Sequence, residues 1–519
     1  MISWPERLNI ADHFLDARIR EGHGDRVALW LDDGPRTYSE VRREAHRWAH
    51  LLSDRGLRPE DRVMIALPDG LDFVAALFGT LELGGVVVMV NPDLEPDALT
   101  ALFAYTRVRA VVVDARRADA FRQAAEAAHP LCPTPDLVEV GSSEVTTALA
   151  AAPDAFETFP THADDPALWL FSGGTTGTPK AVVQTHRSFA NTTELYAVRT
   201  LGYGPDDVTI SVPKLFFGYA TGSNLFFPFA VGASAVLFED KPTSEGLFER
   251  IARHRATILI NVPTMIQRML GHAEEHTVEV DSLRFATSAG EALPVPLYHR
   301  WKEHFGVELL DGLGTAEMWH IFVTNRPGDV HPGTLGKVVE GFELKVCDAE
   351  GAEVGPDEVG QLWVRGDSRA LGYWQNLDKT RNAFRGEWFV GGDLVQRNAD
   401  GVVTYCGRGD DVLKVAGKWL APSDVESCLM RHPRVDECAV VGVEDGEGLM
   451  KPIAFVRSED LGEAPGDDAI AELADQLKAF TLEHLQAYKH PRRVIVLDDF
   501  PRTHLGKIDR GKLKGLAKV

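Results

Sequence analysis

The chain has 519 residues, with 54 basic and 77 acidic side chains and a formal net charge of -23. This length predicts at least two domains, because single hydrophobic cores rarely grow beyond about 250–300 residues. The excess of negative charge argues against a broad surface for nucleic acid or for an anionic membrane, but it leaves room for a local basic pocket.

The cysteines and the first residues favour a cytoplasmic protein. The 5 cysteines are odd in number and form no CxxC pair, which favours reduced thiols over disulfides or a zinc site. The opening Met1-Ile-Ser-Trp-Pro-Glu-Arg lacks the apolar core of a signal peptide. The longest apolar stretch, residues 71–90, is interrupted by charges and by glycines. It therefore predicts a buried helix followed by a buried strand, and not a membrane span.

Short β-branched apolar runs alternate with amphipathic stretches through the first two-thirds of the chain. This alternation is typical of layered α/β folds with largely parallel sheets. Strands are predicted at residues 63–67, 86–90, 110–113, 235–238 and 257–260, and helices at residues 38–52, 118–128 and 246–254.

The pattern changes near Gly333, where short strands split by Gly, Asp and Pro predict a β-rich subdomain. We expect it to complete a large N-terminal domain of layered α/β subdomains at residues 1–408. Residues 409–519 predict a small α+β domain, of a size typical of independent domains. The capping-box spacing of Ser423 and Glu426 predicts the start of its first helix. The predicted fold class is therefore α/β with two domains.

A glycine- and threonine-rich loop, Phe171-Ser-Gly-Gly-Thr-Thr-Gly-Thr-Pro-Lys180, follows an apolar strand. Its glycines let backbone N–H groups approach an anion closely, and its hydroxyls and lysine add donors and a positive charge. It is not a Walker A loop, because Pro179 precedes the lysine and Ala181 stands where Ser or Thr is required. Residues 181–185 also predict a strand instead of a helix. The loop therefore predicts a phosphate site of another kind, with a plain Gly/Thr hairpin as the alternative.

Further motifs follow this loop in order. They are Ser288-Ala-Gly-Glu-Ala-Leu, Asp311-Gly-Leu-Gly-Thr-Ala-Glu317, Gly386-Glu-Trp-Phe-Val-Gly-Gly-Asp393, the run from Gly407 to Pro422, and Pro501-Arg-Thr-His-Leu-Gly-Lys507. Together with the loop, this ordered set resembles the acyl-adenylate-forming superfamily, which contains acyl-CoA ligases, carrier-protein adenylation domains and luciferases. The resemblance covers nearly the whole chain, so chance agreement is a poor explanation.

The resemblance implies that ATP activates a carboxylic acid as an acyl-adenylate. A carboxylate that attacks the α-phosphate brings two anions together, so a cation and Mg²⁺ must offset their repulsion. By resemblance, the catalytic residues are Glu317, which helps to hold Mg²⁺, Thr315 beside it, and Lys507, which reaches the reacting carboxylate from the small domain. The residues implied in binding ATP are Ser172, Gly173, Gly174, Thr175, Thr176, Gly177, Thr178 and Lys180 at the phosphates, Gly290, Glu291, Asp311, Gly312 and Leu313 at adenine, and Asp393 and Arg408 at the ribose.

The resemblance also implies that the small domain rotates between the two half-reactions. Asp410 is then the hinge, and Lys414 and Gly417 line the channel for a thiol. Two positions depart from the family pattern. Ala316 stands where a phosphate-binding Thr usually precedes the metal-binding Glu, and Leu313 replaces an aromatic side chain that often stacks on adenine. The departures concern the phosphate contact and the adenine wall, and they leave the catalytic set complete.

Two aromatic segments, Lys214-Leu-Phe-Phe-Gly-Tyr-Ala220 and Met318-Trp-His-Ile-Phe322, resemble the acid pocket of the benzoate–CoA ligase branch. A flat apolar slot suits an aryl ring, whose burial is worth roughly 4 kcal/mol at about 25 cal/mol per Å². The branch commonly has Ala where this chain has Gly218, so we expect room for a ring substituent. The first segment has no acidic residue to hold an α-amino acid, and its aromatic residues leave no tunnel for a fatty chain. The residues implied around the ring are Gly218, Tyr219, Phe227, Gly314, His320 and Ile321.

These features favour a cytoplasmic ligase, monomeric or homodimeric, that uses ATP, Mg²⁺ and coenzyme A to make the CoA thioester of a benzoate-type acid. The alternative is a stand-alone adenylation enzyme that loads a separate carrier protein, because coenzyme A and carrier-bound phosphopantetheine would enter through the same pantetheine channel. No carrier domain follows Lys507, which favours free coenzyme A. A third interpretation, a non-catalytic acyl- or nucleotide-binding relative, is supported by Ala316 alone. Neither nucleic acid nor a membrane is expected as a partner.

Overall fold

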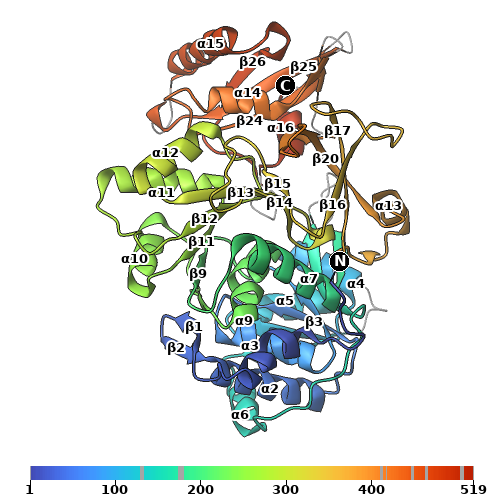
Figure 1. Cartoon of the computed structure of the whole chain (residues 1–519). Helices are drawn as coiled ribbons and strands as arrows, with labels where there is room; N and C mark the ends of the chain where they lie inside the picture. Colours follow the sequence, from blue (N-terminus) through green and yellow to red (C-terminus); the bar gives the residue numbers. More distant parts are fainter. Residues whose placement is uncertain are drawn as a thin grey trace.

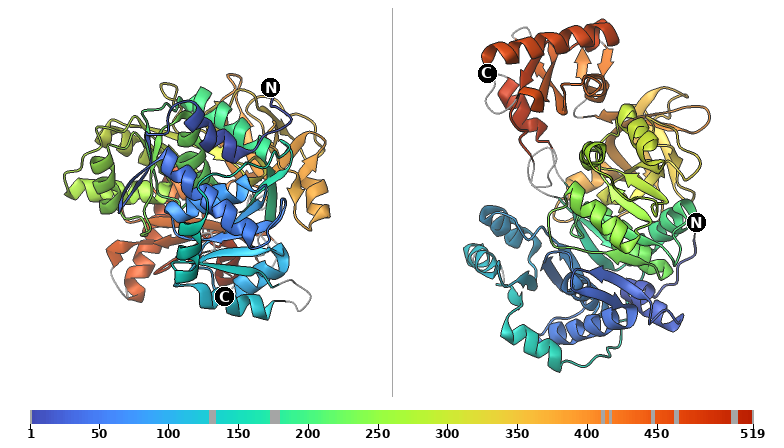
Figure 2. Two further views of the ribbon diagram at one scale, coloured as in Figure 1. Left: turned by 90° about the horizontal axis from the view of Figure 1, so that it is seen from below. Right: turned by 90° about the vertical axis from the view of Figure 1, so that its left-hand side faces the viewer.

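A computed structural model of the chain describes residues 2–128, 134–172, 180–409, 413–415, 418–445, 449–461, 466–502 and 508–517. A large N-terminal part carries two main sheets and a smaller antiparallel sheet, and a small C-terminal part lies at one end of it, orange to red in Figure 1. The right-hand view of Figure 2 shows the small part as a separate unit with its own helices and strands. This two-part architecture confirms the predicted fold class.

The first main sheet has seven strands, in the order β18 (Gly372–Tyr373), β8 (Lys180–Thr185), β7 (Pro166–Ser172), β4 (Val86–Met89), β3 (Arg62–Ala66), β5 (Ala110–Asp114) and β6 (Asp136–Val140). The strands from β7 to β6 run parallel, whereas β8 is antiparallel to both of its neighbours. Its helices are α2 (Tyr38–Asp54), α3 (Leu71–Glu82), α4 (Pro96–Thr106), α5 (Ala118–Ala127) and α6 (Ser143–Ala151).

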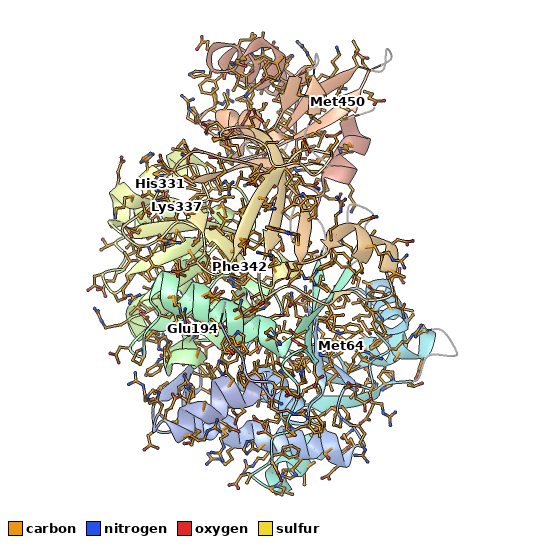
Figure 3. All side chains as sticks on the ribbon, turned by 45° about the vertical axis from the view of Figure 1, so that its right-hand side comes forward. Met64, Glu194, His331, Lys337, Phe342 and Met450 are labelled. Carbon is orange, nitrogen blue, oxygen red and sulfur yellow. The ribbon has the colours of Figure 1, made fainter. Side chains whose placement is uncertain are left out.

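Helices cover both faces of this first sheet, which explains why its strands are apolar throughout. Val63 and Ile65 of β3 pack with residues of α2 and α3, whereas Met64, between them, packs on the other face with residues of α4 and α5. Figure 3 labels Met64 among the side chains of the large part. The apolar stretch at residues 71–90 is thus confirmed as the buried helix α3 followed by the buried strand β4.

The second main sheet has nine strands, in the order β15 (Lys337–Val338), β14 (Ile321–Thr324), β13 (Glu308–Gly314), β12 (Phe285–Ser288), β11 (Ile258–Asn261), β9 (Val208–Ser211), β10 (Ser234–Val236), β1 (Val27–Leu31) and β2 (Gly34–Thr37). The strands from β13 to β1 run parallel. One core cluster joins the two sheets, since it contains Ile65 of β3 and Ile258 of β11. The other described helices that precede the β-rich subdomain are η1 (Asp12–Asp16), α1 (Ala17–Arg20), α7 (His186–Thr192), η2 (Thr193–Leu201), α8 (Gly218–Thr221), η3 (Gly222–Phe226), α9 (Phe227–Val231), α10 (Ser244–His254), α11 (Pro263–Glu275), α12 (Val295–Phe305) and η4 (Ala316–Met318).

The predicted β-rich subdomain is confirmed as an antiparallel sheet of five strands. Its strands alternate buried and partly exposed residues, as β17 does along its length. Its elements are β16 (Glu343–Cys347), β17 (Val359–Arg365), α13 (Leu377–Ala383), β19 (Phe384–Arg385), β20 (Trp388–Arg397) and β21 (Val403–Arg408).

The small C-terminal part has its own core, in which Leu473 and Leu477 pack against Val440 and Val456. The predicted capping box is wrong: α14 begins at Pro422, with Ala421 as its N-cap and no side-chain cap. Proline is favoured at the first helical position because its φ is already helical and it needs no N–H partner there. The elements are β22 (Leu413–Val415), β23 (Lys418–Leu420), α14 (Pro422–Leu429), β24 (Glu437–Glu444), β25 (Met450–Arg457), η5 (Glu459–Leu461), α15 (Asp467–His484), η6 (Ala487–Lys489), β26 (Arg493–Val496) and α16 (Arg510–Ala517).

No helix within the described residues is both long enough and apolar enough to cross a bilayer. The cysteines of the described residues, Cys347, Cys406, Cys428 and Cys438, are free. Cys132 lies outside these residues. The domain boundary at residues 408 and 409 stays a prediction.

Candidate active site

The predicted phosphate loop falls on the hairpin between β7 and β8. Ser172, the last residue of β7, pairs with Lys180, the first residue of β8. β8 continues as a strand, which confirms that the loop does not lead into a helix as a Walker A loop does. The predicted phosphate residues between the strands lie outside the described residues: Gly173, Gly174, Thr175, Thr176, Gly177 and Thr178.

Lys180 lies beside a tyrosine that in turn bonds a glutamate from a distant part of the chain. Its Nζ is 5.0 Å from the centroid of the Tyr373 ring, which belongs to the neighbouring strand β18. The Tyr373 hydroxyl donates a 2.7 Å hydrogen bond to Glu317 Oε1, and Glu317 is 7% exposed. Burial and the Glu317 carboxylate raise the pKa of Tyr373, so the phenol stays protonated and keeps donating. A cation, a phenol and a carboxylate therefore meet where the hairpin begins.

The short 3₁₀ helix η4 fixes the position of Glu317. Thr315 precedes it in an extended conformation, and its Oγ1 accepts a 3.3 Å hydrogen bond from the Met318 N–H. Gln184 Nε2 of β8 donates to the Ala316 carbonyl oxygen at 2.6 Å, and the Ala370 N–H donates to the Glu317 carbonyl oxygen at 2.8 Å. Of the two residues before Glu317, only Thr315 has a hydroxyl that can reach a ligand.

A cavity of about 560 Å³ opens beside η4. Five of the six residues predicted around an aryl ring line it: Gly218, Tyr219, Gly314, His320 and Ile321. Phe227 does not line it. Phe227 is fully buried, and its ring packs on that of His320 with 4.8 Å between the ring centroids. It therefore supports the wall from behind and does not face the cavity.

Sequence reasoning missed several walls of this cavity. Leu170 lies two residues before Ser172 on β7, so strand alternation puts both on one face, a signal that the sequence did carry. Trp319 also lines the cavity, and its φ of 62° is rare for a residue other than glycine. The other missed residues include a set from the end of β4 and from α4, namely Met89, Val90, Asn91, Leu94, Ala98, Ala101, Leu102 and Tyr105.

Gly218 faces Leu170 across very little space. A Cβ on Gly218 would lie 3.2 Å from Leu170 Cδ1 and 3.3 Å from Leu170 Cδ2, closer than ordinary van der Waals contact. Gly218 is the first residue of α8 and is not among the residues with positive φ, so its backbone does not require glycine. The absence of a side chain at Gly218 therefore leaves Leu170 where it is and keeps this part of the cavity wide.

His320 and Tyr219 are the polar side chains of the ring end. The Tyr219 hydroxyl is 2.6 Å from Thr287 Oγ1, and His320 Nε2 is 3.1 Å from the Tyr219 carbonyl oxygen and 3.2 Å from Ser223 Oγ. A carbonyl oxygen can only accept, so Nε2 carries the ring proton. Burial lowers the pKa of His320 to about 4, which keeps the imidazole neutral. Its Nδ1 is then a buried acceptor that has no hydrogen-bond partner among the described residues.

The segments predicted around adenine end neighbouring strands. Ser288, the last residue of β12, pairs with Asp311 of β13. Gly290 follows closely, has a φ of 89° and lines the cavity. Glu291 is exposed, and its carboxylate accepts a 3.0 Å hydrogen bond from Thr264 Oγ1. Both segments thus lie at the carboxyl edge of a parallel sheet, where ligands of α/β proteins commonly bind.

β13 carries the other residues of the predicted adenine site, Asp311, Gly312 and Leu313. Burial raises the pKa of the Asp311 carboxyl to about 8. A Cβ on Gly312 would lie 3.0 Å from the Val323 carbonyl oxygen, so this glycine permits close strand packing. Leu313 is partly buried and packs against the main core, where the family pattern would place an aromatic ring.

The predicted ribose residues also meet. Asp393 of β20 and Arg408 of β21 are partners in the strand register, and Arg408 Nη1 lies 3.6 Å from Asp393 Oδ1. Tyr405 donates a 3.4 Å hydrogen bond to the same carboxylate oxygen. Asp393 is buried and its carboxylate is held at a fixed position, and a carboxylate is the kind of group that accepts hydrogen bonds from a diol.

The remaining predicted residues cannot be placed. Lys507, Asp410 and Gly417 lie outside the described residues. Lys414 belongs to β22, but its side chain is not described. Their roles as catalytic lysine, hinge and thiol channel stay predictions.

Comparison with known proteins supplies the family. A model described as "AMP-binding enzyme" matches residues 16–374, and one described as "AMP-binding enzyme C-terminal domain" matches residues 424–507. The chain belongs to the AMP-binding enzyme family. The first match includes Lys180, Glu317 and Tyr373 of this AMP-binding enzyme, and Lys507 is the last residue of the second.

Individual relatives of this AMP-binding enzyme are similar over almost their whole length. The benzoate–CoA ligase of Thauera aromatica is 40% identical, over 99% of this chain and 97% of the relative. A crystal structure of an anthranilate CoA ligase with anthranoyl-AMP has a TM-score of 0.92 and 35% identity, over 99% of this chain and 98% of that one. The benzoate CoA ligase of Burkholderia xenovorans LB400 has a TM-score of 0.86 and 37% identity, over 98% of this chain and 99% of that one. These relatives confirm the predicted resemblance to the aryl-CoA ligase branch.

Proposed function

We propose that this AMP-binding enzyme is an aryl-CoA ligase that uses ATP to convert a benzoate-type acid into an acyl-adenylate and then transfers the acyl group to coenzyme A. The observation that carries the proposal is the mainly apolar cavity, in which an aryl-sized slot at Gly218 and His320 shares one space with Thr315, close to Glu317. The likeness to benzoate–CoA ligases over nearly the full chain supports it. A non-catalytic binding protein is not favoured, because the chain keeps the charged residues Lys180, Glu317 and Asp393 among its described residues and Lys507 in its sequence.

In the first step, a carboxylate oxygen of the acid attacks the α-phosphorus of ATP, and the bond from this phosphorus to pyrophosphate breaks. Lys180 supplies positive charge at the phosphates, and Asp393 accepts hydrogen bonds from the ribose. Glu317 can hold Mg²⁺, because only Oε1 of its buried carboxylate accepts a hydrogen bond from Tyr373. A bound Mg²⁺ would offset the negative charge of the phosphates. In the second step, the thiol sulfur attacks the acyl carbon and AMP leaves.

The wall of the cavity supports an aryl acid with a hydrogen-bond donor on the ring. The lining residues include no acidic side chain, so nothing in the described wall would hold the ammonium group of an α-amino acid. The neutral His320 has an Nδ1 acceptor that is buried and has no partner among the described residues, and a hydroxyl or amino substituent would supply the missing donor once the wall moves to admit it. A site with a buried acceptor discriminates against analogues that leave it unpaired. We therefore expect hydroxy- or aminobenzoates to be better substrates than benzoate.

Coenzyme A is the proposed acceptor, and a carrier protein is the alternative. The cavity continues from the ring slot to α4, where its walls are Leu94, Ala98 and Ala101. A slender phosphopantetheine arm fits beside the two alanines, and both acceptors carry their thiol at the end of such an arm. We also propose a cytoplasmic location, since free cysteines are typical of that compartment. The proposed mechanism uses no residue of a second subunit, so it is compatible with a monomer and with a homodimer.

The test is acid-dependent ATP–pyrophosphate exchange with benzoate, its hydroxy and amino derivatives, an α-amino acid and a fatty acid. We expect exchange with the aryl acids only. Thioester formation is then measured with coenzyme A and with a purified phosphopantetheinylated carrier protein, and we expect coenzyme A to be used. Exchange with the fatty acid or the amino acid alone would refute the aryl assignment, and thioester on the carrier alone would refute the acceptor.

A further inference from the structure

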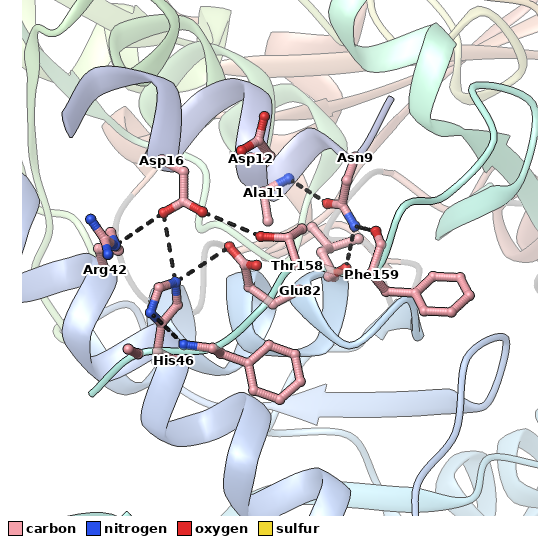
Figure 4. Close-up of polar contacts among 12 residues, drawn as sticks. Asn9, Ala11, Asp12, Asp16, Arg42, His46, Glu82, Thr158 and Phe159 are labelled. Carbon is pink, nitrogen blue, oxygen red and sulfur yellow. Dashed lines mark hydrogen bonds and ion pairs between the residues drawn. The ribbon is translucent and has the colours of Figure 1, made fainter. Parts of the chain in front are cut away.

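Outside the cavity, three buried ionisable side chains join three separate segments of the large part (Figure 4). Asp16 comes from η1, His46 from α2 and Glu82 from α3, and they are 9%, 1% and 0% exposed. One nitrogen or oxygen atom of each lies within 4.8 Å of one atom of each of the others. None of the three lines the cavity, so the cluster does not belong to the proposed aryl-CoA ligase site.

The atoms that face one another in this cluster lack hydrogen-bond partners. His46 Nε2 and both carboxylate oxygens of Glu82 are buried and make no hydrogen bond within the described residues, and Asp16 Oδ1 has only its ion pair with Arg42. Leaving several polar atoms buried and unpaired in one place costs free energy at each of them. Because the unpaired atoms converge on one point, a single group bound there would satisfy them together.

The spacing of these atoms suits a metal ion better than direct hydrogen bonds. His46 Nε2 is 3.6 Å from Asp16 Oδ1 and 3.9 Å from Glu82 Oε1, both beyond hydrogen-bond length. Bonds of about 2.0–2.2 Å at tetrahedral angles place neighbouring ligand atoms of Zn²⁺ about 3.3–3.6 Å apart. Small side-chain movements would therefore bring one imidazole and two carboxylates to coordinating positions.

Hydrogen bonds with neighbouring residues orient His46 and Asp16 for metal coordination. If His46 Nε2 coordinates the ion, the ring proton is on Nδ1. This N–H then donates a hydrogen bond to the Asp154 carbonyl oxygen, 3.2 Å away. Asp16 Oδ2 accepts a 3.3 Å hydrogen bond from Thr158 Oγ1, which leaves Oδ1 for the ion. Arg42 Nε lies 3.2 Å from Asp16 Oδ1 and opposes a cation, but its side chain is 34% exposed and can turn to solvent.

We propose that Asp16, His46 and Glu82 form a binding site for a divalent transition-metal ion, with Zn²⁺ as the expected ion and water as a fourth ligand. One imidazole with two carboxylates is a ligand set that Zn²⁺ accepts. The ion would tie η1, near the start of the chain, to the helices α2 and α3, so its role is structural. The rival arrangement has no metal: the Phe156 N–H, 3.1 Å from His46 Nδ1, donates to it, and Nε2 keeps the proton.

The probe is Co²⁺, added to the full-length protein after chelator treatment and with excess Mg²⁺ to occupy the active-site carboxylate. We expect one equivalent of Co²⁺ with the visible absorption of a four- or five-coordinate ion, no thiolate charge-transfer band, and displacement by Zn²⁺. Zn²⁺ should also raise the Tm. No cobalt absorption in the wild-type protein, or a thiolate band, overturns the proposal.

Variants locate the ion. Glu82→Gln should weaken Co²⁺ binding at least about tenfold and abolish the Zn²⁺-induced rise in Tm. The matched control is Asp12→Asn, which changes a carboxylate of the same segment that pairs with Arg20, and it should bind Co²⁺ normally. Circular dichroism checks that each variant folds, and Asp16→Asn replaces Glu82→Gln if the latter does not. Unchanged binding in the folded cluster variant would overturn the site.

Discussion

The two ends of the active site are built in different ways. At the phosphate end, Lys180, Tyr373 and Glu317 are held by strand pairing and one short hydrogen bond, and each supplies a particular chemical group. At the ring end, Gly218 and Leu170 act through size alone. Changes at the phosphate end should therefore lower activity on all acids alike, whereas changes at the ring end should redistribute activity among acids.

The largest effect is expected from Lys507→Ala, which changes the lysine to which the family resemblance assigns the adenylation step. Acyl-adenylate formation should fall by about two to three orders of magnitude, because a preorganised cation is lost from the transition state. Thioester formation from a supplied aryl-adenylate should persist, as measured by coenzyme A consumption. Lys512→Ala, an exposed lysine of α16, is the control and should keep both activities. Loss of the second step as well would contradict a role confined to adenylation.

The ring end should respond to Gly218→Ala with a change of preference. The new methyl presses on Leu170, so kcat/KM for a bulky substituted benzoate should fall by about 10–200-fold while that for benzoate is kept or improved. Adding Leu170→Val should restore part of the loss by returning space. Gly271→Ala is the matched control, because a Cβ there meets nothing within 4 Å. A uniform loss over both acids would disprove the assignment of Gly218 to the slot.

A smaller, uniform effect is expected from Tyr373→Phe. Losing a hydrogen bond to a buried carboxylate costs about 1.5 kcal/mol, so kcat/KM should fall about tenfold for every acid. The ratio of kcat/KM between two acids should stay constant. If that ratio changes instead, the phosphate and ring ends are coupled through Tyr373, and the contrast drawn between them fails.

The smallest effect is expected from pH. Burial lowers the pKa of His320 to about 4, so the imidazole is neutral above about pH 5 and its Nδ1 stays an acceptor. The preference for a hydroxybenzoate over benzoate, measured as a ratio of kcat/KM, should be flat from about pH 5.5 to 8. A step near the ordinary histidine pKa of about 6.5 would show that His320 titrates as an exposed residue.

The same contrast explains which features the sequence could predict. The α/β layers and the strand after Lys180 were predictable, because hydrophobic periods are local, whereas Asp393 and Arg408 were assigned to one site only by family resemblance. Phe227 was predicted at the ring but lies behind His320. The prediction failed because the sequence does not distinguish an aromatic residue that lines a cavity from one that is buried in the core. The α4 wall carries no local signal, and neither does the Asp16, His46 and Glu82 cluster, whose members meet only after folding.

One feature of β7 bears on how such enzymes diversify. Leu170 lines the ring slot and Ser172, on the same strand, begins the hairpin that the phosphate loop closes. A change that shifts the β7 backbone at Leu170 should therefore disturb the predicted nucleotide site as well as acid selection. Gly218 belongs to α8, so a substitution there changes the width of the slot while the sequence of β7 stays the same. We therefore expect new substrate ranges to evolve first through substitutions at Gly218 on α8, while Leu170 on β7 stays the same.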